Sequence, residues 1–163
     1  MTESTWFDGP HDGGGGGVSR VFALPDYQKN VPVPRATNPD GPVMRGIPDI
    51  SASAATASGY RVLCNGQRFP DAAKNVPPMG GTSAVAPLWA ALVARINQAA
   101  GKRCGFLNPL LYELAAAQGS GVFRNSESGT NGSYLAGPGW NACMGLGSVD
   151  GTRLLEAIRN KKP

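Results

Sequence analysis

A serine lies at the start of an apolar helical pattern, directly after two glycines and a threonine, in the segment Gly80-Gly81-Thr82-Ser83. Glycines allow a tight turn and the close approach of a second backbone. A helix N-terminus offers free N–H groups and the positive end of a dipole, which stabilise a developing oxyanion. The pattern therefore indicates that Ser83 is a catalytic nucleophile. The alternative is that Thr82 or Ser83 only caps the helix.

A serine nucleophile needs a base, and the sequence offers few candidates. His11 is the only histidine, so a Ser-His-Asp triad would depend on it, and an internal zinc cluster built on histidines is excluded. Asp8 and Asp12 are four residues apart, but they lie in glycine-rich sequence where no helix is expected. None of the eleven carboxylates stands four residues after a Glu, and no Gly-Asp-Ser occurs. The chain thus carries a nucleophile without an evident base.

The three cysteines, Cys64, Cys104 and Cys143, form no Cys-x-x-Cys motif. One disulfide together with a free thiol is compatible with this count, and an odd number does not indicate a compartment. The sequence leaves their pairing open.

The helix that would position Ser83 is predicted from Ser83 to about Ala100. Apolar residues recur at spacings of three and four, and Gly101 ends the pattern. Alanine fills most of the other positions, so we expect a buried helix that packs against a sheet. The apolar residues of this face are Val85, Leu88, Trp89, Leu92, Val93 and Ile96.

Five further elements are expected around it. Ile47–Ala52 is a short apolar run that reads as a buried strand, and residues 60–64 form a second β-rich run. Asn65-Gly66, the strongest two-residue hairpin signal, predicts that Gln67–Phe69 returns alongside that run. We expect two more helices, over Pro109–Ala117 and Thr152–Ile158.

Length and composition describe a folded, loop-rich chain. It has 163 residues, of which 41% are hydrophobic and 16% charged, with 23 glycines and 14 prolines. No run reaches the 18 apolar residues of a membrane span. The formal net charge of +4 comes without interleaved aromatic and basic residues, so we expect neither a nucleic-acid partner nor a membrane. The first ten residues, MTESTWFDGP, show no signal-peptide pattern.

The segment GGTSAVAPLWAALVARINQ, residues 80–98, resembles the nucleophile segment of the sedolisin family, the serine-carboxyl peptidases. Gly-Thr-Ser-x-x-x-Pro is shared with subtilisins, but Leu88 follows the proline where subtilisins usually have histidine. The resemblance covers roughly residues 4–158, and its other segments are Gly15–Arg20, Tyr27–Gln28, Arg45–Ala52, Gly105–Tyr112, Ala136–Trp140 and Gly145–Gly147.

This resemblance implies a subtilisin-like α/β fold, in which helices flank a parallel sheet, and an extracellular, acid-active endopeptidase that acts on peptides or proteins. It implies that Ser83 is the nucleophile. It also implies a helical Glu and Asp as the base, and a third Asp that helps to hold the oxyanion. These carboxylates lie N-terminal to the matching region in the family and have no counterpart here. The chain therefore resembles the C-terminal half of the catalytic domain, and we expect it to be inactive alone.

Within this interpretation, residues 1–163 form one portion of a domain: glycine- and proline-rich loops over 1–46, strands and the nucleophile helix over 47–124, a calcium-loop-like segment over 125–151, and a terminal helix and tail over 152–163. Two alternatives stay open. The chain is a truncated, non-catalytic homologue, or it is one half of a split peptidase that a separate N-terminal chain completes.

The family resemblance also implies a calcium loop. Two Asp carboxylates and three backbone carbonyls supply its oxygens, which suit a hard cation. The matching positions here are Asn125, Ser126, Gly137, Gly139 and Asn141, so Asn replaces both Asp residues. We expect a metal-free loop held by hydrogen bonds, and the alternative is that the adjacent Glu127 compensates as a ligand.

Other residues of the resemblance are expected to be structural. Asp49 is interpreted as a carboxylate that ties loops together, and Ala55 stands where the family often has Asp. Trp89 and Trp140 are expected in the core rather than at a substrate surface. Cys143 matches a position where family members often have Cys.

Overall fold

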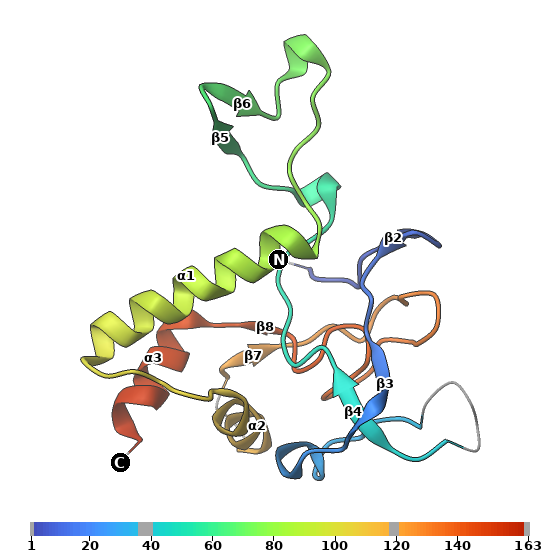
Figure 1. The fold of residues 1–163 in the computed structure, drawn as a ribbon, viewed down its shortest axis with the longest axis vertical. Helices are drawn as coiled ribbons and strands as arrows, with labels where there is room; N and C mark the ends of the chain where they lie inside the picture. Colours follow the sequence, from blue (N-terminus) through green and yellow to red (C-terminus); the bar gives the residue numbers. More distant parts are fainter. Residues whose placement is uncertain (1, 36–40, 118–120, 162–163) are drawn as a thin grey trace.

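The computed structural model describes residues 2–35, 41–117 and 121–161 (Figure 1). It is a mixed α/β structure. The strands are β1 Phe7–Gly9, β2 Asp12–Gly13, β3 Gly17–Ala23, β4 Met44–Ile47, β5 Val62–Cys64, β6 Gln67–Phe69, β7 Phe123–Arg124 and β8 Ser148–Val149. The helices are α1 Thr82–Ala100, α2 Asn108–Ala116 and α3 Gly151–Asn160, with 3-10 turns η1 Asp26–Gln28, η2 Thr56–Ser58 and η3 Ala72–Lys74.

The core lies where α1, α2 and α3 meet the loop before β8. Leu111, Leu154 and Ile158 are at most 3% exposed, and Trp140 is 2% exposed. Helix α3 presents Leu154 and Ile158, one turn apart, to α1, as the sequence pattern predicts. Trp89 is also buried, so the expectation that both tryptophans belong to the core is confirmed.

Helix α1 has the expected bounds, one residue longer at its start, and ends at Gly101, whose φ of 67° is left-handed. The expectation that it is a buried helix is wrong. Only Trp89 and Ile96 are buried, and Leu88 is 46% exposed. Its inner face packs on the core, but no layer of the described residues covers its outer face.

The described residues of the segment 1–46 are less irregular than expected. Strand β3 pairs antiparallel with β4, across a separation of some twenty residues that the local pattern does not reveal. A Cβ at Gly46 of β4 would lie 2.5 Å from the ring of Trp140, so a side chain at this position would displace the core tryptophan. The expectation of loops throughout this segment is therefore wrong in part.

The strand expected over Ile47–Ala52 ends at its first residue. β4 stops at Ile47, and the chain continues outside any strand, with a bend at Asp49 and no ladder partner among the described residues. Ser51 N donates to Gly147 O at 3.0 Å, and Leu146 N donates to Asp49 O at 2.8 Å, so a loop rather than a strand holds this segment. The described strands form four separate two-stranded antiparallel sheets.

The hairpin is as expected. β5 pairs with β6 around Asn65 and Gly66, whose φ values are 49° and 78°, as a type I′ turn requires. At its base Tyr60 N donates to Met79 O at 2.7 Å. The hairpin extends away from the rest of the structure, directly before the start of α1 (Figure 1).

All three cysteines lie in the described part of the chain and are free thiols. Burial raises the pKa of Cys143, whose thiol donates to Tyr134 O. Within the described ranges no helix is both long and apolar enough to cross a lipid bilayer.

Candidate active site and candidate metal loop

Ser83 lies in the first turn of α1, and Gly81 is the residue that caps this helix. Gly81 has φ 86° and ψ 162°, and no side chain accepts a hydrogen bond from the first turn. The interpretation of Thr82 or Ser83 as the N-cap is therefore wrong. The Ser83 side chain is exposed, and its hydroxyl forms no hydrogen bond with the described residues. Backbone N–H groups of the first helical turn lie beside it, and such groups can stabilise a developing oxyanion.

The glycines before Ser83 bring two segments of the chain together. Gly81 N donates to Ala54 O at 2.6 Å, and a Cβ at Gly80 would lie 2.7 Å from the same oxygen. The close backbone approach predicted from Gly80 and Gly81 is thus present, and its partner is Ala54, in the irregular segment after β4. This contact fixes where α1 starts.

The substitute bases considered from the sequence lie on a hairpin rather than a helix. Asp8 is in β1 and Asp12 in β2, and His11 lies in the turn between them. All three are exposed, and Asp8 accepts the indole N–H of Trp6 at 2.8 Å. None of them forms a hydrogen bond with Ser83, so they do not form a catalytic constellation with it.

A cleft of about 920 Å³ lies beside the start of α1. The N-terminal segment and the segment after β4 line it, and Thr82 and Val85 form part of its wall. Ser51 also lines it, and its buried Oγ has no hydrogen-bond partner in the described part of the chain. Such a group costs about 1–3 kcal/mol when left unpaired.

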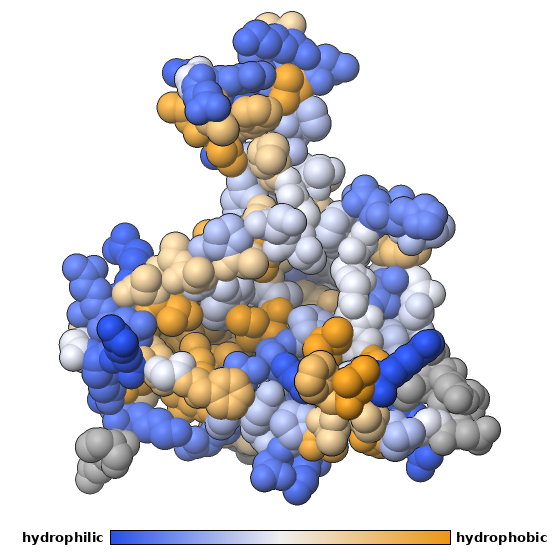
Figure 2. Space-filling model, in the orientation of Figure 1, coloured by the Kyte–Doolittle hydropathy of each residue, from blue (hydrophilic) through white to orange (hydrophobic). Residues whose placement is uncertain are grey.

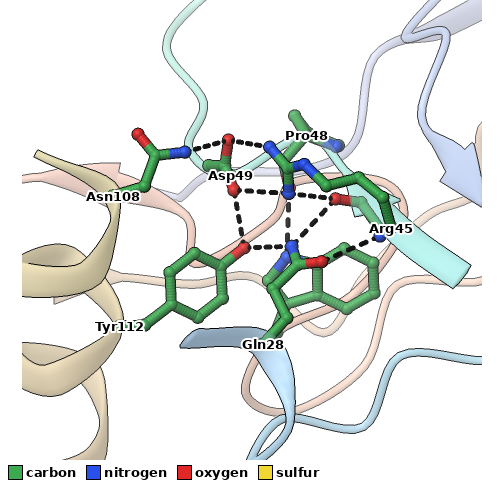
Figure 3. Close-up of polar contacts among 8 residues, drawn as sticks. Gln28, Arg45, Pro48, Asp49, Asn108 and Tyr112 are labelled. Atoms are coloured by element: carbon green, nitrogen blue, oxygen red, sulfur yellow. Dashed lines mark hydrogen bonds and ion pairs between the residues drawn. The ribbon is translucent and has the colours of Figure 1, made fainter. Parts of the chain in front are cut away.

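Asp49 organises a polar network between β4, η1 and α2 (Figure 3). Its carboxylate accepts hydrogen bonds from both terminal guanidinium nitrogens of Arg45. It also accepts from the side-chain amide of Asn108 and from the hydroxyl of Tyr112, each at 2.8 Å. The expectation that Asp49 ties loops together is confirmed.

Gln28 completes this network from η1. Its Nε2 donates to Tyr112 Oη at 2.6 Å and to Gly46 O at 2.9 Å, and its Oε1 accepts from Gly46 N at 2.9 Å. Gln28 is fully buried with every polar atom paired. Its role and those of Arg45 and Tyr112 were not predicted from the sequence, because these residues meet only in the folded chain.

The network also sets the charge states of its members. The hydrogen bond to Asp49 raises the pKa of Arg45 further above its ordinary value, so the guanidinium stays charged. Burial raises the pKa of Tyr112 well above its ordinary value, so the hydroxyl stays neutral and donates. This fixed pattern of donors and acceptors restricts the backbone at Asp49, which directly precedes Ile50 and Ser51.

The candidate metal loop brings together four of its five expected positions. Asn141 Nδ2 donates to Gly137 O at 2.9 Å and to Asn125 Oδ1 at 3.2 Å, and Asn125 Nδ2 donates to Gly139 O. Ser126 Oγ instead accepts from Ser128 N at 3.2 Å.

This arrangement does not suit a cation, because N–H groups rather than free oxygens face the two glycine carbonyls. The adjacent Glu127 is exposed, and no hydrogen bond joins it to Asn125 or Asn141. The described residues also contain no cluster of three or more His, Cys, Asp or Glu that could hold a metal ion.

Comparison with known proteins places the whole chain. No protein-family model matches it. It is 48% identical over 164 residues to kumamolisin from Bacillus sp. (strain MN-32), an alignment that covers 96% of this chain and 27% of kumamolisin. It is 31% identical over 167 residues to sedolisin from Pseudomonas sp. (strain 101), covering 97% of this chain and 26% of that protein. It is 30% identical to tripeptidyl-peptidase 1 from Homo sapiens, with 90% and 27% covered.

The structure agrees. It superimposes on Pseudomonas sedolisin, a serine-carboxyl proteinase solved in complex with two molecules of pseudo-iodotyrostatin, with a TM-score of 0.79 and 29% identity. That match covers 98% of this chain and 41% of the solved chain. The chain spans about a quarter of the length of the curated relatives it matches. The chain belongs to the sedolisin family of serine-carboxyl peptidases and corresponds to the C-terminal part of that family's catalytic domain.

Proposed function

We propose that this chain supplies the nucleophile Ser83 to an acid-acting serine-carboxyl endopeptidase. The observation that carries the proposal is the exposed, unbonded hydroxyl of Ser83 in the first turn of α1, after the left-handed Gly81. Ser83 Oγ attacks the carbonyl carbon of a peptide bond, and N–H groups at the helix end help to hold the resulting oxyanion. The amine leaves with a proton, and water then releases the acyl group from Ser83.

The proton of Ser83 must pass to a base, and no carboxylate or imidazole of the described residues hydrogen-bonds to it. The resemblance to the family implies a helical Glu and Asp for this role and a third Asp for the oxyanion. We propose that the polypeptide that completes the domain supplies all three, whether it lies on the same chain or on a separate one. The isolated chain is then inactive, because a catalytic unit that lacks its base loses many orders of magnitude in rate.

The exposed outer face of α1 is consistent with a further layer of the domain that packs on it. Ala86, Ala90 and Ala94 repeat at intervals of four residues and are all exposed. Leu88 lies on a different side of the helix and is 46% exposed. Figure 2 shows this apolar surface along α1, above a hollow that also contains apolar residues. Small side chains let another element approach closely.

The proposed substrates are peptides or proteins, and the proposed location is extracellular, as the family resemblance implies. A second candidate is a non-catalytic homologue with a binding or stabilising role. The replacement of both calcium-site Asp residues by Asn125 and Asn141 favours it, because selection for peptidase activity would be expected to retain the metal.

The test is to produce the chain together with the N-terminal part of the catalytic domain, either its own or that of kumamolisin. Cleavage of an N-terminally acetylated peptide is assayed at pH 3–5, because acetylation blocks removal of tripeptides from a free N-terminus. We expect Ser83→Ala to lose activity on the order of 10⁶-fold. Thr82→Ala, which removes the neighbouring hydroxyl, should lose less than about tenfold.

An inactive complex whose two halves bind tightly would favour the non-catalytic homologue. Activity that survives Ser83→Ala would exclude Ser83 as the nucleophile. Cleavage by the 163-residue chain alone would refute the proposed need for a completing polypeptide.

A further inference from the structure

The side-chain amide of Asn141 has only one orientation that its surroundings allow. Its Oδ1 accepts the backbone N–H groups of Cys143 at 3.1 Å and Met144 at 3.0 Å. Backbone N–H groups can only donate, so the atom that faces them must be an oxygen. The main chain of Asn141 is also held, because it exchanges two hydrogen bonds with Gly145 at 3.1 and 2.8 Å. The Nδ2 group must therefore point to the opposite side.

On that side, Nδ2 meets oxygens only. It donates to Gly137 O and Asn125 Oδ1, while Asn125 Nδ2 donates to Gly139 O. We call these four residues, Asn125, Gly137, Gly139 and Asn141, the amide clasp. Asn141 Nδ2 also lies 3.5 Å from Gly139 O, so the oxygens of Gly137, Gly139 and Asn125 gather round an amide nitrogen that donates to them.

A carboxylate at position 141 would reverse this balance. One of its oxygens could still accept the N–H groups of Cys143 and Met144. The other would face Gly137 O and the residue at position 125 without any donor between them. Several oxygens and a negative charge then converge, which is the environment that a hard cation stabilises. In the observed chain, amide hydrogens lie between these oxygens, where the carboxylate form would need a cation.

We propose that the amide clasp replaces the calcium ion of the family's loop, so that this chain holds the loop by hydrogen bonds alone and is independent of metal. The amide clasp also affects the core, because Trp140 lies between two of its residues. Trp140, between Gly139 and Asn141, is 2% exposed and donates its indole N–H to Pro48 O at 3.0 Å. This hydrogen bond couples the conformation of the loop that holds Asn125 and Asn141 to the segment that follows β4. The proposal rests on the clasp geometry and not on catalysis by Ser83.

The experiment compares the unmodified chain with the double variant Asn125→Asp, Asn141→Asp. Calorimetric titration with calcium chloride should give no binding to the unmodified chain and a Kd of about 10⁻⁴–10⁻³ M for the double variant. Thermal melting should be the same for the unmodified chain in chelator and in millimolar calcium. The double variant should melt lower in chelator, and calcium at ten times its Kd should raise its folded-to-unfolded ratio about elevenfold.

Asn131→Asp is the matched control. Asn131 Oδ1 also accepts two backbone N–H groups, those of Ser133 and Tyr134, and its Nδ2 also donates to two carbonyls, those of Gly16 and Ala142. It lies outside the clasp. This variant introduces one carboxylate where the double variant introduces two, and affinity for calcium follows the charge of the ligands. It should lose stability through the same loss of amide hydrogens, but millimolar calcium should not restore it.

A second readout does not depend on a cooperative melt. Terbium is a luminescent substitute for calcium, and Trp140 is adjacent in sequence to two clasp residues. Excitation of tryptophan should produce terbium emission from the double variant and none from the unmodified chain. Calcium or terbium binding by the unmodified chain would overturn the proposal. A double variant that is equally stable in chelator and in calcium, with no terbium emission, would also overturn it.

Discussion

The carboxylate of Asp49 and the guanidinium of Arg45 form a two-pronged ion pair, with Nη1–Oδ1 at 2.9 Å and Nη2–Oδ2 at 2.6 Å. The side chains are 18% and 19% exposed, so water screens the pair only weakly. Asn108 and Tyr112 of α2 complete the coordination of the carboxylate. The pair therefore joins α2 to β4 at the point where the chain turns toward Ser51.

Replacing Asp49 with Asn should lower the free energy of unfolding by about 3 kcal/mol, because Arg45 would remain largely buried without its counter-charge. Urea denaturation measures this loss. The control is Asp26→Asn, which breaks the exposed pair between Asp26 and Lys29 and should have no measurable effect. Equal effects of the two substitutions would contradict the importance assigned to the network.

Replacing Gly81 with Ala should destabilise the start of α1 by about 1–3 kcal/mol, because φ 86° with ψ 162° is a region that essentially only glycine adopts. The added Cβ would meet only Ser83 N, at 3.9 Å, so the effect would come from the backbone rather than from a clash. Hydrogen exchange of the first turn of α1 and urea denaturation provide the measurements.

Gly15→Ala is the control for this change. A Cβ at Gly15 has nothing within 4 Å, and its φ lies outside the left-handed region. It should change stability by less than about 0.5 kcal/mol. If Gly81→Ala were equally harmless, the turn before Ser83 would not require its observed conformation.

Asp150 should make the stability of α3 depend on acid pH. It caps the helix by accepting from Arg153 N and Thr152 N, each at 3.1 Å. The hydrogen bond from Arg153 N is the main cause that lowers its pKa, together with the bond from Thr152 N and the nearby charges of Arg124 and Arg153. The folded-state pKa lies below the unfolded value of about 3.9. The cap therefore contributes fully above that value, and its contribution is lost as pH falls through the folded-state pKa.

Asp150→Asn retains a capping oxygen without a titratable charge. The difference in urea midpoint between the unmodified chain and this variant should shrink on acidification from neutral pH to below the folded-state pKa. Glu156→Gln removes an exposed carboxylate from the same helix and should leave the pH profile of the unmodified chain unchanged. A difference that stays constant with pH for Asp150→Asn would show that the carboxylate does not act as a charged cap.

Local sequence determined the elements whose partners lie close along the chain. Short segments of sequence determine the apolar spacing of α1, the left-handed Gly101 at its end and the Asn65-Gly66 turn. The reason is that helices and two-residue hairpins close their hydrogen bonds within a few residues. The glycine pair before Ser83 indicated the family and a close backbone approach. The loss of both carboxylates at Asn125 and Asn141 was also readable from residue types alone.

Only the tertiary structure decided what those residues contact. β3 pairs with β4 across a long loop, and Gln28 meets Tyr112 across 84 positions, so no local pattern encodes either contact. The outer face of α1 has the same alanine-rich sequence whether buried or exposed, and its exposure depends on which layer lies above it. The orientation of the Asn141 amide is likewise set by two N–H groups that fold back onto its oxygen, because an amide has a donor and an acceptor end and its neighbours select which end faces the loop.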